Sequence, residues 1–216
     1  FARSPDGSKL AIAAAGASVV LRDLAGTELA RMTGHTGPIE AVAFSPDGRI
    51  VASGSADRSI RLWDASDGHS IARLEGHGDS VVALAFRANN EAWTLFSGSS
   101  DGSVRAWDST GKETMKLGAQ LEPLTTIVVG ANRRWLTTAA RDGTVHFWSL
   151  PEAQLRASLR IVAGRDASYV FTPSGAIQIF GEATDLPVCR VGPTIVPFAL
   201  CEERFTTSDL LSHVLE

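Results

Sequence analysis

Two dipeptides recur along this chain of 216 residues at nearly constant spacing. Gly34-His35 returns as Gly76-His77, and Trp63-Asp64 returns as Trp107-Asp108, with a weaker form at Trp148-Ser149. Self-similarity with a period of about 40–45 residues is typical of repeat architectures, in which each copy is one small supersecondary unit. We therefore expect the chain to fold as copies of one small sheet rather than as a single mixed domain.

Within each copy, short apolar runs alternate with turn residues. The runs are rich in Val, Ile, Phe or Trp and are bounded by Gly, Pro, Asp or Ser, a pattern that predicts short antiparallel strands and an all-β fold. The first copy is cut short: Phe1 already lies inside its first strand, and 18–23 matches 59–64. The predicted strands of the next three copies are 39–44, 50–55, 59–64 and 70–74; then 80–86, 92–98, 103–108 and 113–117; then 124–129, 134–140, 144–149 and 154–159.

In motif order, spacing and dipeptides, residues 1–160 resemble the WD-repeat β-propeller family. In that family each repeat forms a four-stranded sheet, and the sheets pack radially around a central channel. The resemblance implies four WD-type blades, the first truncated, within a larger ring, because four blades are fewer than this family usually has. We assign 1–160 to the propeller portion and 161–216 to a C-terminal extension.

Four polar or amphipathic positions recur in step with the repeat. The resemblance implies that they form a hydrogen-bonded chain running Asp, His, Ser, Trp, since a buried indole N–H needs an acceptor and a buried imidazole needs partners. The first copy has Arg22 at the Trp position and no matching Asp, and Ala119 replaces the fourth His, so we expect looser blades at the ends. The positions are His35, Ser53, Asp57 and Trp63; His77, Ser97, Asp101 and Trp107; and Thr138, Asp142 and Trp148.

The same residue types, Ser, His and Asp, also make hydrolase triads. Here the set occurs twice at repeat spacing, whereas a nucleophile needs no duplication, and no Gly-x-Ser-x-Gly turn leads into a helix. Cys201 with His213 is a weak alternative, since no orienting Asn or Asp motif accompanies it. We therefore favour a structural role for the recurring set and predict no enzyme activity and no cofactor.

Charge and cysteine content restrict the partners and the compartment. The formal net charge is −4, and Arg133-Arg134 is only a short basic pair, so we expect no nucleic-acid binding. No apolar run approaches about eighteen residues, which predicts no membrane span. Cys189 and Cys201 are too few for a disulfide scaffold, and we expect free thiols in a reducing compartment, the cytoplasm. No Cys-x-x-Cys or His cluster has metal-ligand spacing.

After about residue 160 the Trp-Asp rhythm stops. The runs 169–171 and 176–180 flank Thr172-Pro173-Ser174-Gly175, which predicts a hairpin. Three prolines between 187 and 197 predict an irregular stretch, and 206–215 predicts a short helix with Ser208 as its N-cap. Together these elements would form a hairpin-and-helix cap.

This tail resembles a segment that follows propellers in large bacterial multidomain proteins with caspase-like or nucleotide-binding effector domains. The resemblance rests on the hairpin and on Arg204-Phe205 followed by Leu210-Leu211. The chain itself contains no phosphate-binding Gly-Lys-Ser/Thr loop and no caspase nucleophile motif.

The function predicted from these features is a non-enzymatic protein-protein interaction scaffold or sensor that binds partners through the propeller rims. The candidate partner contacts are Arg58, Asp79 and Arg141, on the rim that the resemblance places near the channel. One alternative is a regulatory, autoinhibitory propeller of a larger bacterial effector, whose partner is another domain of the same polypeptide. A second is a self-assembling structural unit that oligomerises through unsealed blades and exposed edge strands.

Overall fold

The chain folds into β-strands, twenty in number, throughout the part that the structure describes, which confirms the all-β prediction. It divides into two compact units, Phe1–Arg133 and Arg134–Glu216. The predicted boundary between 160 and 161 stays a prediction, and the helix predicted for 206–215 lies outside the described residues. The computed structural model describes residues 1–89, 92–117, 122–150, 152–161, 167–171, 177–181, 189–191 and 194–196.

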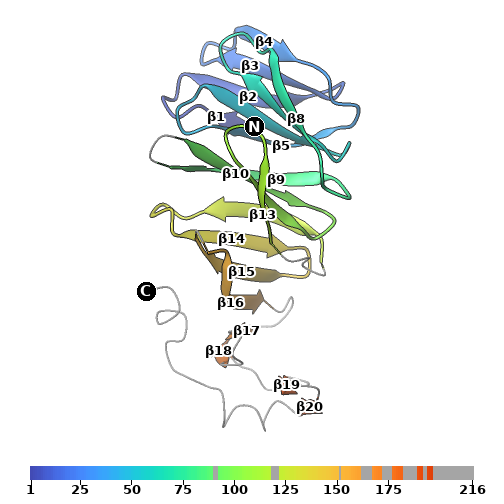
Figure 1. Ribbon diagram of the computed structural model, residues 1–216, viewed down its shortest axis with the longest axis vertical. Helices are drawn as coiled ribbons and strands as arrows, with labels where there is room; N and C mark the ends of the chain where they lie inside the picture. The colour runs from blue at the N-terminus through green and yellow to red at the C-terminus, as the bar shows by residue number, and fades with distance from the viewer. Residues whose placement is uncertain are drawn as a thin grey trace. The chain divides into compact units, whose positions relative to one another are not determined.

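The first unit contains three four-stranded antiparallel sheets, each with its strands in sequence order, followed by one further strand (Figure 1). Strand boundaries fall within about two residues of the sequence prediction. The first sheet is β1 (Ala2–Arg3), β2 (Lys9–Ala14), β3 (Ser18–Asp23) and β4 (Glu28–Met32); the second is β5 (Ile39–Phe44), β6 (Ile50–Ser55), β7 (Ile60–Asp64) and β8 (Ser70–Leu74). The third is β9 (Val81–Ala88), β10 (Trp93–Ser99), β11 (Val104–Trp107) and β12 (Glu113–Leu117), and β13 (Leu124–Val129) follows.

The sheets of the first unit pack face to face, with the first strand of each sheet beside the first strand of the next (Figure 1). Strands β1, β5, β9 and β13 therefore share one edge of the stack, and β4, β8 and β12 lie at the opposite, outer edge. Between the first two sheets, Leu21 and Met32 pack in one cluster with Val51 and Trp63. The equivalent cluster beyond the second sheet includes Trp107. Each tryptophan of the Trp-Asp pairs thus belongs to a core between sheets.

Glycine allows the close approach of neighbouring sheets at one repeated position. A methyl group on Gly54 of β6 would lie 2.9 Å from the carbonyl oxygen of Val81 in β9. At the equivalent position in β10, a methyl on Gly98 would lie 2.8 Å from Cδ1 of Ile127 in β13. Because real Cβ atoms do not approach other atoms so closely, these two positions require glycine for the observed packing.

The outer strands share an irregularity. In every sheet of the first unit the register between the third and fourth strands shifts by one residue, beside Arg22, Trp63 or Trp107. The shift leaves Leu29, Ile71 and Thr114 without a partner across the strand pair, which is the definition of a β-bulge.

The second unit contains five antiparallel strands in sequence order and a separate two-stranded pair. Strand β17 pairs with β16 and β18, so the predicted hairpin extends the sheet that contains β14 to β16. The stretch around the prolines, predicted to be irregular, contains a strand pair instead, and that prediction was wrong. The strands are β14 (Trp135–Ala140), β15 (Thr144–Ser149), β16 (Gln154–Ile161), β17 (Ala167–Phe171), β18 (Ile177–Gly181), β19 (Cys189–Val191) and β20 (Thr194–Val196).

Candidate functional site

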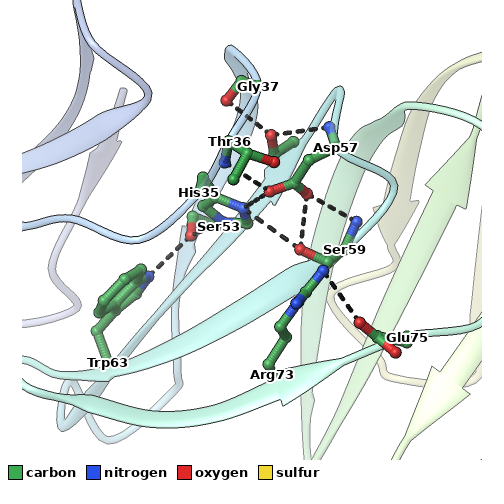
Figure 2. Close-up of polar contacts among 10 residues, drawn as sticks. His35, Thr36, Gly37, Ser53, Asp57, Ser59, Trp63, Arg73 and Glu75 are labelled. Carbon is green, nitrogen blue, oxygen red and sulfur yellow. Dashed lines mark hydrogen bonds and ion pairs between the residues drawn. The ribbon is translucent and has the colours of Figure 1, made fainter.

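In the second sheet, the structure brings His35, Ser53, Asp57 and Trp63 together in one hydrogen-bonded chain (Figure 2). The indole N–H of Trp63 donates to Ser53 Oγ at 2.8 Å, and His35 Nε2 lies 2.9 Å from the same oxygen. His35 Nδ1 lies 2.8 Å from Asp57 Oδ2. A carboxylate only accepts, so the neutral imidazole carries its proton on Nδ1 and accepts at Nε2 from the Ser53 hydroxyl. Every polar atom along the chain then has a partner.

The Asp57 carboxylate links the turn between β6 and β7 to the segment before β5. Beyond His35, it accepts the backbone N–H of Thr36 at 3.0 Å and both the N–H and the hydroxyl of Ser59. Burial raises the pKa of Asp57, but the hydrogen bonds from Ser59, Thr36 and His35 outweigh it and hold the pKa well below its usual value. The acid therefore stays ionised wherever the protein is folded near neutral pH.

The third sheet repeats the chain with one difference. Trp107 and His77 both contact Ser97 Oγ at 2.8 Å, as in the second sheet. His77 Nδ1, however, lies 3.0 Å from the hydroxyl of Ser103 and 3.6 Å from Asp101 Oδ2, so the expected direct Asp–His bond is replaced by contact through Ser103. Burial of the imidazole lowers the pKa of His77 to about 4, against an opposing effect of Asp101.

The Asp101 carboxylate remains a link between segments. It accepts the backbone N–H of Gly78, which precedes β9, and that of Ser103, which directly precedes β11. Burial raises the pKa of Asp101, but hydrogen bonds from Ser103 and Gly78 outweigh this effect and lower the pKa to about 2.

The remaining copies hold only part of the set. In the second unit, Trp148 donates to Thr138 Oγ1 at 3.2 Å, and Asp142 accepts the N–H and the hydroxyl of Thr144 within its own turn. The position of the missing histidine, Ala119, lies outside the described residues.

The first sheet lacks the Ser, Asp and Trp of the network. Pairing of β2 with β3 places Ile12 where the second sheet has Ser53, and Arg22 where it has Trp63. Gly16 occupies the turn position of Asp57. An apolar side chain therefore stands in this blade where the others have a buried hydroxyl.

The buried serines cannot act as nucleophiles in this arrangement. Ser53 and Ser97 are 0% exposed, and each hydroxyl oxygen already contacts an indole N–H and an imidazole. A hydrolase needs its nucleophile at a surface that substrate reaches, with a place beside it for the reacting carbonyl. The geometry supports a role in holding each sheet rigid, because satisfied buried networks specify one conformation.

The three rim candidates are exposed and sit in loops. Arg58 lies in the turn between β6 and β7, directly after Asp57, and has a φ of 70°. Asp79 lies before β9, where its carbonyl accepts the hydroxyl of Ser99. Arg141, in the second unit, directly precedes Asp142 in the turn between β14 and β15. The structure places Arg58 and Asp79 beside the His35 and His77 networks of their own sheets.

Sequence reasoning missed two recurring positions. Ser59 and Ser103 follow the acid by two residues and contact both the acid and the imidazole, and this spacing was visible in the sequence. Arg61 and Arg105 occupy equivalent positions opposite Ser53 and Ser97. The role of these two arginines depends on which residues they face across the strand pair, and the repeat spacing alone does not specify this register.

The described residues hold neither a membrane-spanning helix nor a metal-ligand cluster. In the ranges that the structure describes, no helix is long and apolar enough to cross a bilayer. Nor do three or more His, Cys, Asp or Glu side chains gather there as a metal-ligand set. A cytoplasmic location stays a prediction.

Comparison with known proteins gives matches across the repeats. COMPASS component SWD3 of Saccharomyces cerevisiae is 29% identical over 153 residues, 67% of this chain and 49% of that protein. A U3 snoRNP-associated protein-like YAOH of Oryza sativa is 41% identical over 112 residues, 52% of this chain and 22% of that protein. An uncharacterized WD repeat-containing protein, sll1491, of Synechocystis is 38% identical over 87 residues, 40% of this chain and 25% of that protein. The chain spans about half or less of the length of these relatives.

The family model described as WD domain, G-beta repeat, matches residues 26–64, 68–108 and 111–149. The three matched segments together cover more than half of the chain, and each ends at the last residue of a Trp-Asp or Trp-Ser pair. The matched residues contain the second, third and fourth copies of the repeat, including the two complete hydrogen-bonded networks. This chain belongs to the WD-repeat family.

Proposed function

We propose that this chain is part of a non-enzymatic protein-interaction scaffold and that a protein partner binds the rim formed by the turns at Arg58 and Asp79. The buried networks hold the sheets, and the exposed turns beside them are then presented in fixed positions. Rigid presentation reduces the ordering cost of association, which is a large share of what binding must overcome.

The conformation of Arg58 carries this proposal. Its φ of 70° lies in the left-handed region, as do those of Ala17, Gly102 and Gly143 at the equivalent turn positions, with φ of 54°, 77° and 85°. Arg58 is the charged residue among the four. A non-glycine residue in this region costs about 1 kcal/mol relative to glycine. A long, exposed, cationic side chain at such a position is costly for the fold and suits recognition, since strained residues cluster at functional sites.

The relatives support an interaction role. The yeast relative is named as a component of COMPASS, and the rice relative is named as associated with the U3 snoRNP. Both names describe membership of an assembly rather than a catalytic activity. For this chain, an assembly role and its partner are proposals.

Affinity capture with matched variants tests the proposal. The immobilised chain is compared with Arg58→Gly and with Arg49→Gly, which removes the same charge from the exposed loop between β5 and β6. We expect wild type and Arg49→Gly to capture the same proteins from lysate of the source cells and Arg58→Gly to lose them. Loss by both variants, or by neither, would contradict a binding site at Arg58.

The stability of Arg58→Gly separates recognition from folding. Because glycine adopts positive φ without steric cost, we expect this variant to be more stable than wild type by roughly 1 kcal/mol in urea unfolding. A variant that is more stable yet does not bind has lost a contact. A variant that is less stable would remove the argument from backbone conformation.

Of the two alternative functions, the structure provides observations that bear on self-assembly. Self-assembly through edge strands is disfavoured, because the outer strands of the first unit each have a bulge and β4 and β8 expose Arg31 and Arg73, both of which obstruct edge-to-edge pairing. A mass that rises with concentration in light scattering would support self-assembly. The regulatory role in a larger bacterial effector stays a prediction.

A further inference from the structure

Two equivalent arginines in neighbouring sheets have different surroundings. In the third sheet, Arg105 of β11 forms an ion pair with Glu113, the first residue of β12. The pair packs on a glycine: a methyl group on Gly76 would lie 2.8 Å from Arg105 Nη1 and 3.3 Å from Glu113 Oε2. Arginine, carboxylate and glycine backbone thus form one compact arrangement directly before the His77 network.

The second sheet has the same arrangement without its acid. Arg61 stands opposite Ser53 as Arg105 stands opposite Ser97, and a methyl on Gly34 would lie 3.0 Å from Arg61 Nη1. Ser70 pairs with Trp63 as Glu113 pairs with Trp107, so a hydroxymethyl group occupies the place of the carboxylate.

The Arg61 guanidinium is unpaired. Among the described residues it has neither a hydrogen-bond acceptor nor an ion-pair partner, and its contact is the face of Trp63, 5.8 Å from the ring centroid. Its Nε is buried without a partner, as is Nε of Arg105, so the presence of the acid is the main difference between the polar surroundings of the two arginines. The side chain is only partly buried, and an external group can reach it.

A partly desolvated cation without a counter-ion is unfavourable, and an oxyanion that reaches it gains a charge-assisted hydrogen bond. The occupied site in the third sheet identifies the complementary group as a carboxylate. Position indicates its source. Gly34 directly precedes His35, and Arg61 lies in β7 three residues after Arg58, so the guanidinium is near the rim proposed to bind a protein, and Ser70 lies at the other end of the β7–β8 pair.

We propose that Arg61, Gly34 and Ser70 form a carboxylate-binding site that takes one acidic side chain, Asp or Glu, of the protein partner. This inference rests on the proposed function. The partner's carboxylate takes the position that Glu113 has beside Arg105, and Ser70 leaves the space for it. Arg61 is thereby a second cationic contact for the partner, besides Arg58.

Acetate titration tests the site itself, without a partner. The Nε–Hε signals of Arg61 and Arg105 are followed by NMR as sodium acetate replaces sodium chloride at constant ionic strength. We expect a saturable shift for Arg61 and none for Arg105. Ser70→Glu should abolish the Arg61 response, whereas Ser70→Gln should retain it. Glu113→Ser should transfer the response to Arg105. An Arg61 signal that does not respond, or responds equally in Ser70→Glu, overturns the site.

Capture experiments test the source of the carboxylate. We expect Ser70→Glu, whose new acid fills the site from within the chain, to weaken capture of the rim partner roughly tenfold or more, and Ser70→Gln to leave it within about twofold. Equal capture by both variants overturns the partner's carboxylate as the ligand. If Arg58→Gly loses the partner while Arg61 ignores acetate, the carboxylate site fails and the proposed function stands. If no variant affects capture while Arg61 binds acetate, the proposed function fails.

Discussion

The network carboxylates differ in the segments that they connect. Asp57 and Asp101 accept hydrogen bonds both from their own turn and from the loop before the first strand of the sheet. Among the described residues, Asp142 accepts hydrogen bonds from Thr144 in its own turn and lies 3.6 Å from Nη2 of Arg160 in β16, whose side chain is half exposed, so this ion pair contributes little. A link between distant segments constrains more of the chain than a local bond does.

Removal of each acid should therefore have unequal effects on stability. We expect Asp57→Ala and Asp101→Ala to lower the free energy of unfolding by about 2 kcal/mol each, because buried donors lose a charged acceptor. Asp142→Ala should cost less than about 1 kcal/mol. Urea unfolding of the three variants measures the difference. Equal losses for Asp101→Ala and Asp142→Ala would contradict the structural role of the network.

Burial of His77 makes stability depend on pH. Its pKa of about 4 lies below that of an imidazole in the unfolded chain, about 6.5, so between these values the unfolded chain binds a proton that the folded chain does not. Stability should be complete above about pH 6.5 and fall by up to roughly 3 kcal/mol as the pH drops to about 4. Below that, protonation of Asp101, with its pKa of about 2, adds to the loss.

Urea midpoints between pH 7 and pH 4 measure this dependence. His77→Gln should flatten the curve in this window. His69→Gln is the matched control, because the side chain of His69 is 60% exposed, and it should leave the slope as in wild type. Parallel slopes for wild type and His77→Gln would contradict the assignment to His77.

At the scale of the strand, the stability cost of replacing a glycine depends on whether it lies where two sheets approach each other closely. Gly54 faces the Val81 backbone at a distance that excludes a methyl group. We expect Gly54→Ala to destabilise by about 1–3 kcal/mol, the range for overpacking, since β9 must move away from β6. Gly26→Ser is the comparison variant. A methyl group at Gly26 would have no atom within 4 Å, so the only cost of substitution there comes from the positive φ of 88°. A Gly54→Ala variant as stable as wild type would show that the sheets separate without cost.

Strand boundaries in the repeats followed from sequence because turn residues mark them. The predicted 39–44 and 70–74 agree with β5 and β8, and 59–64 is one residue longer than β7. Strands β19 and β20 were missed because each has three residues beside a proline, too few for an alternating pattern. The side-chain network was expected from family resemblance rather than from physics. The insertion of Ser103 between His77 and Asp101 was not predicted, because both sheets carry the same residue types and differ by less than 1 Å in where the acid lies.

Across the first unit, the complete networks lie in the second and third sheets, whereas the first sheet carries Ile12 and Arg22 at their positions. We expect amide hydrogens in β6 and β10 to exchange more slowly than those in β2, because local opening of a sheet with a network breaks more buried bonds. Hydrogen-exchange mass spectrometry on peptides from each sheet measures this. Equal protection of β2 and β6 would show that apolar packing alone sets local stability.

The close approach at Gly54 and Gly98 also affects recognition. At Gly54, strand β6 approaches β9 to a distance that a methyl group would exclude. When two neighbouring sheets lie closer together, the turns that connect their strands also lie closer together. We therefore expect Gly54, in the interior of the second sheet, to set how far apart the turns with Arg58 and Asp79 lie, and with that the width of any side chain that fits between them.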